Sequence, residues 1–164
     1  MTRLVIPGST RDPSPRSAGC RIRSGMTAIV LMGATTAFAQ ATPVGTWRNI
    51  DDKTGEAKAE VRIVENGGVV SGNIVRRLAK DAKPDAKCEE CRDERKDKPI
   101  DGLEIIRGAK KDPDENVWRG GKILDPENGR EYTLRLTPIE GGRRLEVRGS
   151  IGPFGRTQTW VRVQ

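Results

Sequence analysis

Two cysteines, Cys88 and Cys91, have the most distinctive chemistry in this chain, and they stand three positions apart in a charged segment. A pair at this spacing can form a local disulfide, exchange disulfides with other thiols or ligate a metal. Glu89 and Glu90 lie between the thiols and would raise their pKa values, which disfavours thiol exchange. Tetrahedral zinc needs about four ligands. The chain has no His and no second Cys pair, so Asp or Glu would have to complete such a site.

The first 39 residues have the form of an export signal. Two arginines precede a short apolar stretch, residues 27–36, and a small-x-small sequence ends at Ala39. We expect cleavage there, so that the mature chain begins at Gln40 or at the next residue. The apolar stretch is too short to span a bilayer, and an N-terminal membrane anchor that stays attached is the alternative. Residues 1–20 are long for such a signal, which suggests a start codon placed too far upstream.

Export would place the chain in an oxidising compartment, and this bears on the cysteines. Cys20 lies in the signal region, so Cys88 and Cys91 remain as an even pair, and we predict that they form a disulfide. The bridge closes a very small ring, so we expect it to shape the charged segment rather than to stabilise the whole fold. The predicted location is periplasmic or secreted.

The charge of the mature chain argues against nucleic-acid binding. The whole chain carries 30 basic and 23 acidic residues, but these fall to 25 and 22 once the five Arg and one Asp of residues 1–39 are removed, a net charge of +3. Nucleic-acid binding needs a clustered basic face. Here basic and acidic residues alternate, so we expect no nucleic-acid partner.

Catalysis is the least favoured function class. The chain has no His, which is the commonest general base, and it has neither a Gly-x-Ser-x-Gly sequence nor a phosphate-binding glycine loop. Glu104 and Glu131 could in principle act as the carboxylate pair of a glycosidase. With 22 carboxylates in the mature chain, however, some pairs are close by chance. We predict no enzyme, no metal site and no cofactor.

These residues must be positioned by strands, because short alternating apolar runs and glycine-rich turns fill residues 40–164. The clearest hairpin is Trp118–Leu136, in which two apolar runs flank Pro126 and Asn128-Gly129. We find no convincing helical period over 12 or more residues. We predict an all-β domain, an eight-stranded antiparallel up-and-down barrel with both edges closed. The expected strands lie near residues 45–50, 58–65, 69–76, 102–107, 118–124, 132–136, 144–148 and 156–163, with residues 108–115 as a polar turn.

One long segment, residues 77–101, differs from the rest of the domain. It contains eight basic and eight acidic residues, and Leu78 and Ile100 are its only large apolar side chains. A loop of this length inside a compact domain usually covers a site or is disordered. A short helical turn is expected at residues 79–86, limited by Pro84.

The chain resembles two groups of proteins. Gly45-Thr46-Trp47 is similar to the Gly-x-Trp that opens the first strand of lipocalins and avidins. Nearly the whole mature chain resembles an exported bacterial family, domain of unknown function 2147. The matching sequences are Gly45-Thr46-Trp47, Cys88-x-x-Cys91, Pro99-Ile100-x-Gly102-Leu103, Trp118-x-Gly120-Gly121-Lys122-Ile123, Asp125-Pro126-Glu127-Asn128-Gly129 and Gly155-Arg156-Thr157-Gln158-Thr159-Trp160. The resemblance implies export and a barrel, and it carries no catalytic residues over.

The lipocalin resemblance implies that Trp47 plugs one end of the barrel. Trp160 and Arg162 share a face of the last strand. This face is either solvated, with Trp160 covering the base, or it supplies an Arg that stacks on Trp47 across the closure. By analogy with lipocalins we favour the stacking, with Trp47, Trp160 and Arg162 as the barrel closure.

Three residues are candidates for ligand contact. Asn49 follows Trp47 by two positions and would therefore also face inward, where its amide needs a hydrogen-bond partner from protein, water or ligand. Tyr132 and Trp118 are the other two, although most Trp side chains serve only as core. We predict a carrier of a small, partly apolar or envelope-derived ligand. The alternative is a non-catalytic cell-envelope interaction module with a filled interior and peripheral envelope association.

Overall fold

The computed structural model describes residues 41–163. The predicted signal segment, residues 1–39, and the predicted cleavage site between Ala39 and Gln40 lie outside the described residues. Within the described part of the chain, no helix has the length and apolar character needed to cross a membrane.

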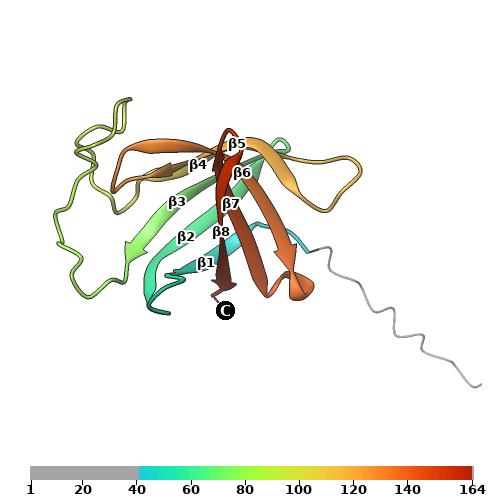
Figure 1. Ribbon diagram of the computed structural model, residues 1–164, viewed down its shortest axis with the longest axis horizontal. Helices are drawn as coiled ribbons and strands as arrows, with labels where there is room; N and C mark the ends of the chain where they lie inside the picture. The colour runs from blue at the N-terminus through green and yellow to red at the C-terminus, as the bar shows by residue number, and fades with distance from the viewer. Residues whose placement is uncertain (1–40, 164) are drawn as a thin grey trace, which may run out of the picture. The chain divides into compact units, whose positions relative to one another are not determined.

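Eight antiparallel strands form a closed barrel in which each strand pairs with the next along the chain (Figure 1). The barrel closes where β1 pairs with β8, with Trp47 opposite Arg162 and Asn49 opposite Trp160. The strands are β1 (Gly45–Ile50), β2 (Ala57–Asn66), β3 (Val69–Arg77), β4 (Glu104–Lys111), β5 (Trp118–Asp125), β6 (Arg130–Ile139), β7 (Arg144–Ile151) and β8 (Phe154–Arg162). The predicted all-β, eight-stranded up-and-down barrel is confirmed.

Two local predictions are wrong. Residues 108–111 were expected in a polar turn, but β4 continues through them because Ala109 is fully buried and Lys111 pairs with Trp118 of β5. Residues 79–86 were expected to form a helical turn. They instead form two separate turns, with the N–H of Ala82 donating to the carbonyl of Ala79 and the N–H of Ala86 donating to that of Lys83.

One end of the barrel is sealed by Trp47 and Arg162. The Arg162 guanidinium lies 4.2 Å from the centroid of the Trp47 ring, which is a cation–π distance. Trp47 is fully buried, and its indole N–H donates to the carbonyl of Pro43 at 2.6 Å. The guanidinium also donates three hydrogen bonds, 2.6–2.8 Å long, to the carbonyls of Gly142, Val44 and Thr42. The structure therefore has the stacking that the lipocalin analogy favoured.

The glycine of the Gly-x-Trp sequence is required by this closure. Gly45 has φ +139°, and a Cβ at this position would lie 2.3 Å from Nη1 of Arg162. Any larger residue would push the guanidinium away from Trp47 and from its three carbonyl acceptors.

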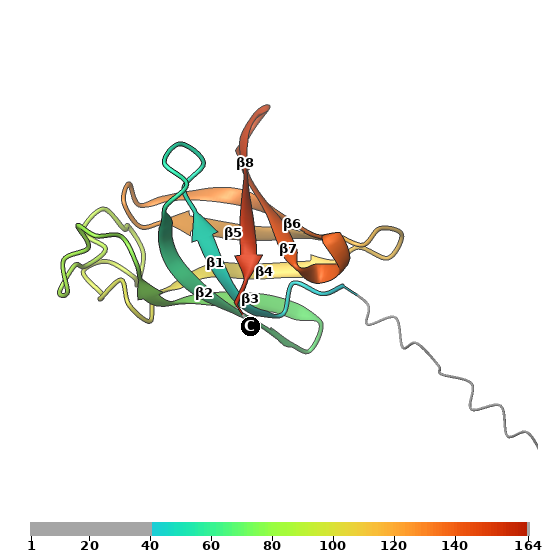
Figure 2. The same cartoon turned by 90° about the horizontal axis from the view of Figure 1, so that it is seen from below.

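The opposite end of the barrel carries the β1–β2, β5–β6 and β7–β8 turns and the long β3–β4 loop. Figure 2 shows β1 and β8 side by side where the sheet closes.

Candidate functional site

The barrel contains a cavity of about 930 Å³ at the end opposite the Trp47–Arg162 closure. Its inner wall is mostly apolar and comes from inward-facing strand residues, while its rim comes from the turns and the long loop. The wall residues are Ala59, Val61, Ile74, Ile105, Ile123, Val147 and Trp160. The alternation of each strand produces this wall, because every second side chain faces the interior.

Two of the three predicted ligand-contact residues line this cavity. Asn49 and Tyr132 are both cavity-lining, whereas Trp118 is not. Trp118 is 3% exposed and lies in the core at the start of β5, and the Lys111 ammonium group lies 5.6 Å from the centroid of its ring. The sequence could not place Trp118, because alternation shows that it faces inward but not at which end of the barrel.

Trp160 was predicted as part of the closure, and the structure also makes it a wall of the cavity. It is 1% exposed and stands opposite Asn49 in the β1–β8 pairing. Among the described protein groups, neither the buried Oδ1 of Asn49 nor the buried Nε1 of Trp160 has a hydrogen-bond partner. Gln158, two positions before Trp160, lines the cavity as well and was not singled out from the sequence.

The rim is charged, and several of its charges are paired. Lys58 bridges two turns, with its ammonium group 3.3 Å from Asp51 and 3.7 Å from Glu127. Backbone N–H groups of the β1–β2 turn donate to Asp51 and lower its pKa to about 2, so it is ionised at neutral pH. Arg156 pairs with Asp52 at 2.9 Å. These pairs connect neighbouring turns around the mouth of the cavity.

The long loop contains the predicted disulfide, which joins Cys88 and Cys91 within the loop. Cys88 is fully buried and Cys91 is 2% exposed, so the bridge faces the protein rather than solvent. The loop packs closely on the β5–β6 turn, because a Cβ at Gly129 would lie only 1.8 Å from the carbonyl oxygen of Glu90. The disulfide therefore shapes the part of the loop that lies against the barrel.

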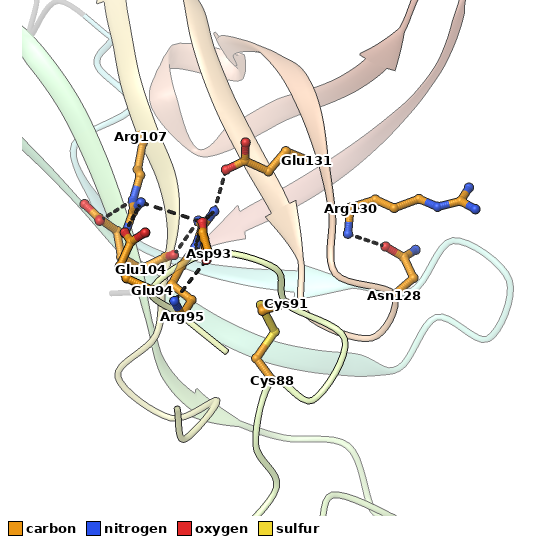
Figure 3. A network of polar contacts seen from close by, with 10 residues as sticks. All are labelled: Cys88, Cys91, Asp93, Glu94, Arg95, Glu104, Arg107, Asn128, Arg130 and Glu131. Atoms are coloured by element: carbon orange, nitrogen blue, oxygen red, sulfur yellow. Dashed lines mark hydrogen bonds and ion pairs between the residues drawn. A yellow bond between two sulfur atoms is a disulfide. The ribbon is translucent and has the colours of Figure 1, made fainter. Parts of the chain in front are cut away.

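A buried arginine anchors the loop to the barrel, and sequence reasoning did not find it. The Arg95 side chain is 3% exposed and pairs with Asp93 and with Glu131 of β6 (Figure 3). Its Nη1 also donates to the carbonyl of Glu104 at 3.2 Å. The guanidinium holds the pKa of Asp93 well below its ordinary value, at about 2. The loop is thus joined to two strands by charge-assisted hydrogen bonds.

The two carboxylates considered for glycosidase chemistry have structural partners. Glu131 pairs with Arg95, and Glu104 pairs with Arg107, which also contacts Glu94 of the loop (Figure 3). Both belong to the loop anchor rather than to the cavity wall. Across residues 41–163, no group of three or more His, Cys, Asp or Glu side chains is arranged to hold a metal ion.

Comparison with known proteins agrees with this geometry. Residues 45–162 match the model of a family described as an uncharacterized protein conserved in bacteria, DUF2147. The chain belongs to this family. No curated protein sequence matches the chain.

A solved structure of protein HP1028 from Helicobacter pylori, described as belonging to the lipocalin family, superimposes with a TM-score of 0.64 and 18% identity. The match covers 76% of this chain and 84% of that one, and at this identity it shows the fold alone. A DUF2147 chain with a disulfide fits an exported bacterial protein.

Proposed function

We propose that this protein is an exported carrier that binds a small, partly apolar ligand inside its barrel. The observation that carries the proposal is the cavity of about 930 Å³ with an apolar wall and an open, charged rim. Small-molecule pockets typically measure about 300–1,000 Å³ and combine an apolar wall with a few polar groups. Asn49, Tyr132 and Gln158 would supply those polar groups.

Export is part of this proposal. Residues 1–39 would act as a signal peptide cleaved after Ala39, and the mature protein would work in the periplasm or outside the cell. The disulfide supports this location, because such bonds persist in oxidising compartments. Mass analysis of the mature protein would test it: we expect an N-terminus at Gln40 or the next residue, and a retained segment 1–39 would refute cleavage.

The ligand proposal can be tested by following tryptophan fluorescence during titration with lipid-like and envelope-derived compounds. Trp160 lines the cavity, so a bound ligand should change its emission and the change should saturate. Ala59→Phe would place an aromatic ring in the cavity, because Ala59 is a wall residue. Val75→Phe is the matched control, since Val75 is 49% exposed on β3.

We expect the Ala59→Phe variant to bind at least about tenfold more weakly than the wild type, because bulk in a shaped pocket displaces ligand atoms. Val75→Phe should bind like the wild type. No response across the panel, or an Ala59→Phe variant that binds normally, would rule out carriage in this cavity. Thermal unfolding of both variants would show that they remain folded.

A second candidate function, an envelope interaction module, is favoured by one surface feature. Phe154 is 81% exposed and Ile151 is 52% exposed, and both lie at the β7–β8 turn beside the cavity mouth. Large exposed apolar side chains close together often mark a contact surface. Co-sedimentation with envelope fractions should fall for Phe154→Ser if this turn docks there. Equal sedimentation of wild type and variant would remove this candidate.

A further inference from the structure

The cavity floor contains two polar groups that lack protein partners. Four buried side-chain nitrogen or oxygen atoms of the described residues have no hydrogen-bond partner, and two of them, Oδ1 of Asn49 and Nε1 of Trp160, belong to cavity-lining residues. A buried donor or acceptor without a partner costs about 1–3 kcal/mol. A ligand group that supplied both missing hydrogen bonds would remove this cost.

Strand register places these two groups next to each other. Asn49 and Trp160 are opposite residues in the antiparallel β1–β8 pair, so their side chains leave the sheet on the same face. The next pair along these strands on that face is Trp47 and Arg162, which seals the barrel. Asn49 and Trp160 therefore form one layer directly above the seal, at the inner end of the cavity.

The charges around the cavity exclude an ionic ligand group at this depth. The charged residues that line the cavity belong to strand ends, turns and the long loop at its mouth: Lys58, Arg77, Asp81, Lys83, Asp125, Glu127 and Arg156. Arg162 lies near the floor, but its three nitrogens donate to backbone carbonyls and its face stacks on Trp47. A carboxylate or phosphate at the floor would lose its hydration without gaining a counter-ion.

We infer that the floor formed by Asn49 and Trp160 binds an uncharged hydroxyl group, so that the ligand is an aliphatic or alicyclic alcohol that enters hydroxyl first. The indole N–H of Trp160 donates to the hydroxyl oxygen, and the hydroxyl donates to Oδ1 of Asn49. The apolar body of the ligand then lies against wall residues such as Ile105 and Val147. This inference rests on the proposed function, and it specifies the ligand class for the same cavity.

The test compares two isomers, 1-decanol and 1-methoxynonane, by isothermal titration calorimetry on the full mature protein. The two compounds contain the same atoms, but only the alcohol can donate a hydrogen bond. We expect 1-decanol to bind about fivefold more tightly, which corresponds to one neutral hydrogen bond.

Two variants separate the roles of the two floor residues. Asn49→Leu removes the acceptor with little change of shape, so the affinity ratio of the two isomers should fall to about one. Trp160→Phe removes a donor that both isomers use, so both should bind more weakly while the ratio persists. If Asn49→Leu does not fold, the wild-type comparison and Trp160→Phe still decide the question.

Each outcome has a distinct meaning. Equal binding of the two isomers by the wild type would overturn the hydroxyl site but leave the proposed carrier function intact. A ratio that survives in Asn49→Leu would overturn the hydroxyl site in the same way. Binding of neither probe would overturn both the hydroxyl site and carriage of ligands of this class.

Discussion

The contact between the long loop and the β5–β6 turn predicts a specific cost for Gly129→Ala. Gly129 has φ +63°, and a Cβ there would lie 1.8 Å from the carbonyl oxygen of Glu90 and 2.9 Å from the nitrogen of Cys91. Separations below 3.0 Å force a shift of one partner. The loop backbone beside the disulfide and the β5–β6 turn must therefore move apart by at least about 1.2 Å, the difference between 3.0 and 1.8 Å.

Gly55→Ala is the matched control for this variant. Gly55 also has positive φ, +71°, but a Cβ there meets no atom within 4 Å. Each substitution carries the backbone cost of a left-handed conformation, about 1–2 kcal/mol for a residue with a Cβ. Only Gly129→Ala adds the cost of forced overpacking, about 1–3 kcal/mol. We therefore expect Gly129→Ala to lower the free energy of unfolding by about 2–5 kcal/mol and Gly55→Ala by about 1–2 kcal/mol.

Urea unfolding measures these two free energies, and limited trypsin digestion locates the change. The loop 77–101 contains eight Lys and Arg residues, so a loop displaced from the barrel should be cleaved faster in Gly129→Ala than in the wild type or Gly55→Ala. If the two variants lose the same stability and show the same cleavage rate, the loop does not pack on this turn and the reasoning is wrong.

Three further predictions concern the closure, the response to acid and the disulfide. Arg162→Met removes three hydrogen bonds to carbonyls and the contact with Trp47. The free energy of unfolding, measured by thermal unfolding, should therefore fall by about 3 kcal/mol. A change near zero would show that Arg162 does not stabilise the closure. Arg76 and Arg48 lower the pKa of Glu60 from 4.5 to about 2, so the unfolded state takes up its proton first as pH falls. The stability that this carboxylate gives is complete above its unfolded pKa and is lost as the pH falls from 4.5 to about 2. Glu60→Gln should therefore flatten the pH dependence of the free energy of unfolding in urea over that range. An unchanged pH dependence would contradict the pairing of Glu60 with the two arginines. Replacing both disulfide cysteines by Ser should lower the free energy of unfolding by about 2 kcal/mol, the value for a four-residue ring. The far-ultraviolet circular dichroism of the barrel should stay unchanged while the loop becomes protease-sensitive. Loss of the barrel spectrum would show that the bridge stabilises the whole fold.

The barrel could be predicted from the sequence because its determinants are local. Alternating apolar residues, turn sequences such as Asn128-Gly129 and the absence of a helical period each act over a few positions. The extension of β4 through Lys111 was missed because residues 108–111 have a polar composition typical of turns. There the pairing with β5 and the burial of Ala109 outweigh local preference.

The site could be predicted only in part because it depends on contacts between distant residues. Alternation from Trp47 places Asn49 inside the barrel, and this reasoning needs only two positions. The pairing of Arg95 with Glu131 joins residues 36 positions apart, and no motif in the sequence connects them. The depth of Trp160 and the exclusion of Trp118 from the cavity depend on strand register, which the sequence alone does not specify.

The central claim is that a ligand lies inside the barrel, and nuclear Overhauser effects between 1-decanol and the protein test it most directly. We predict cross-peaks from the alkyl chain to methyl groups of the cavity wall, at Ile105 and Val147, and none to the exposed methyl groups of Val75 or Val161. Cross-peaks confined to Val75, Val161 or other exposed side chains would place the ligand on the surface and contradict the account.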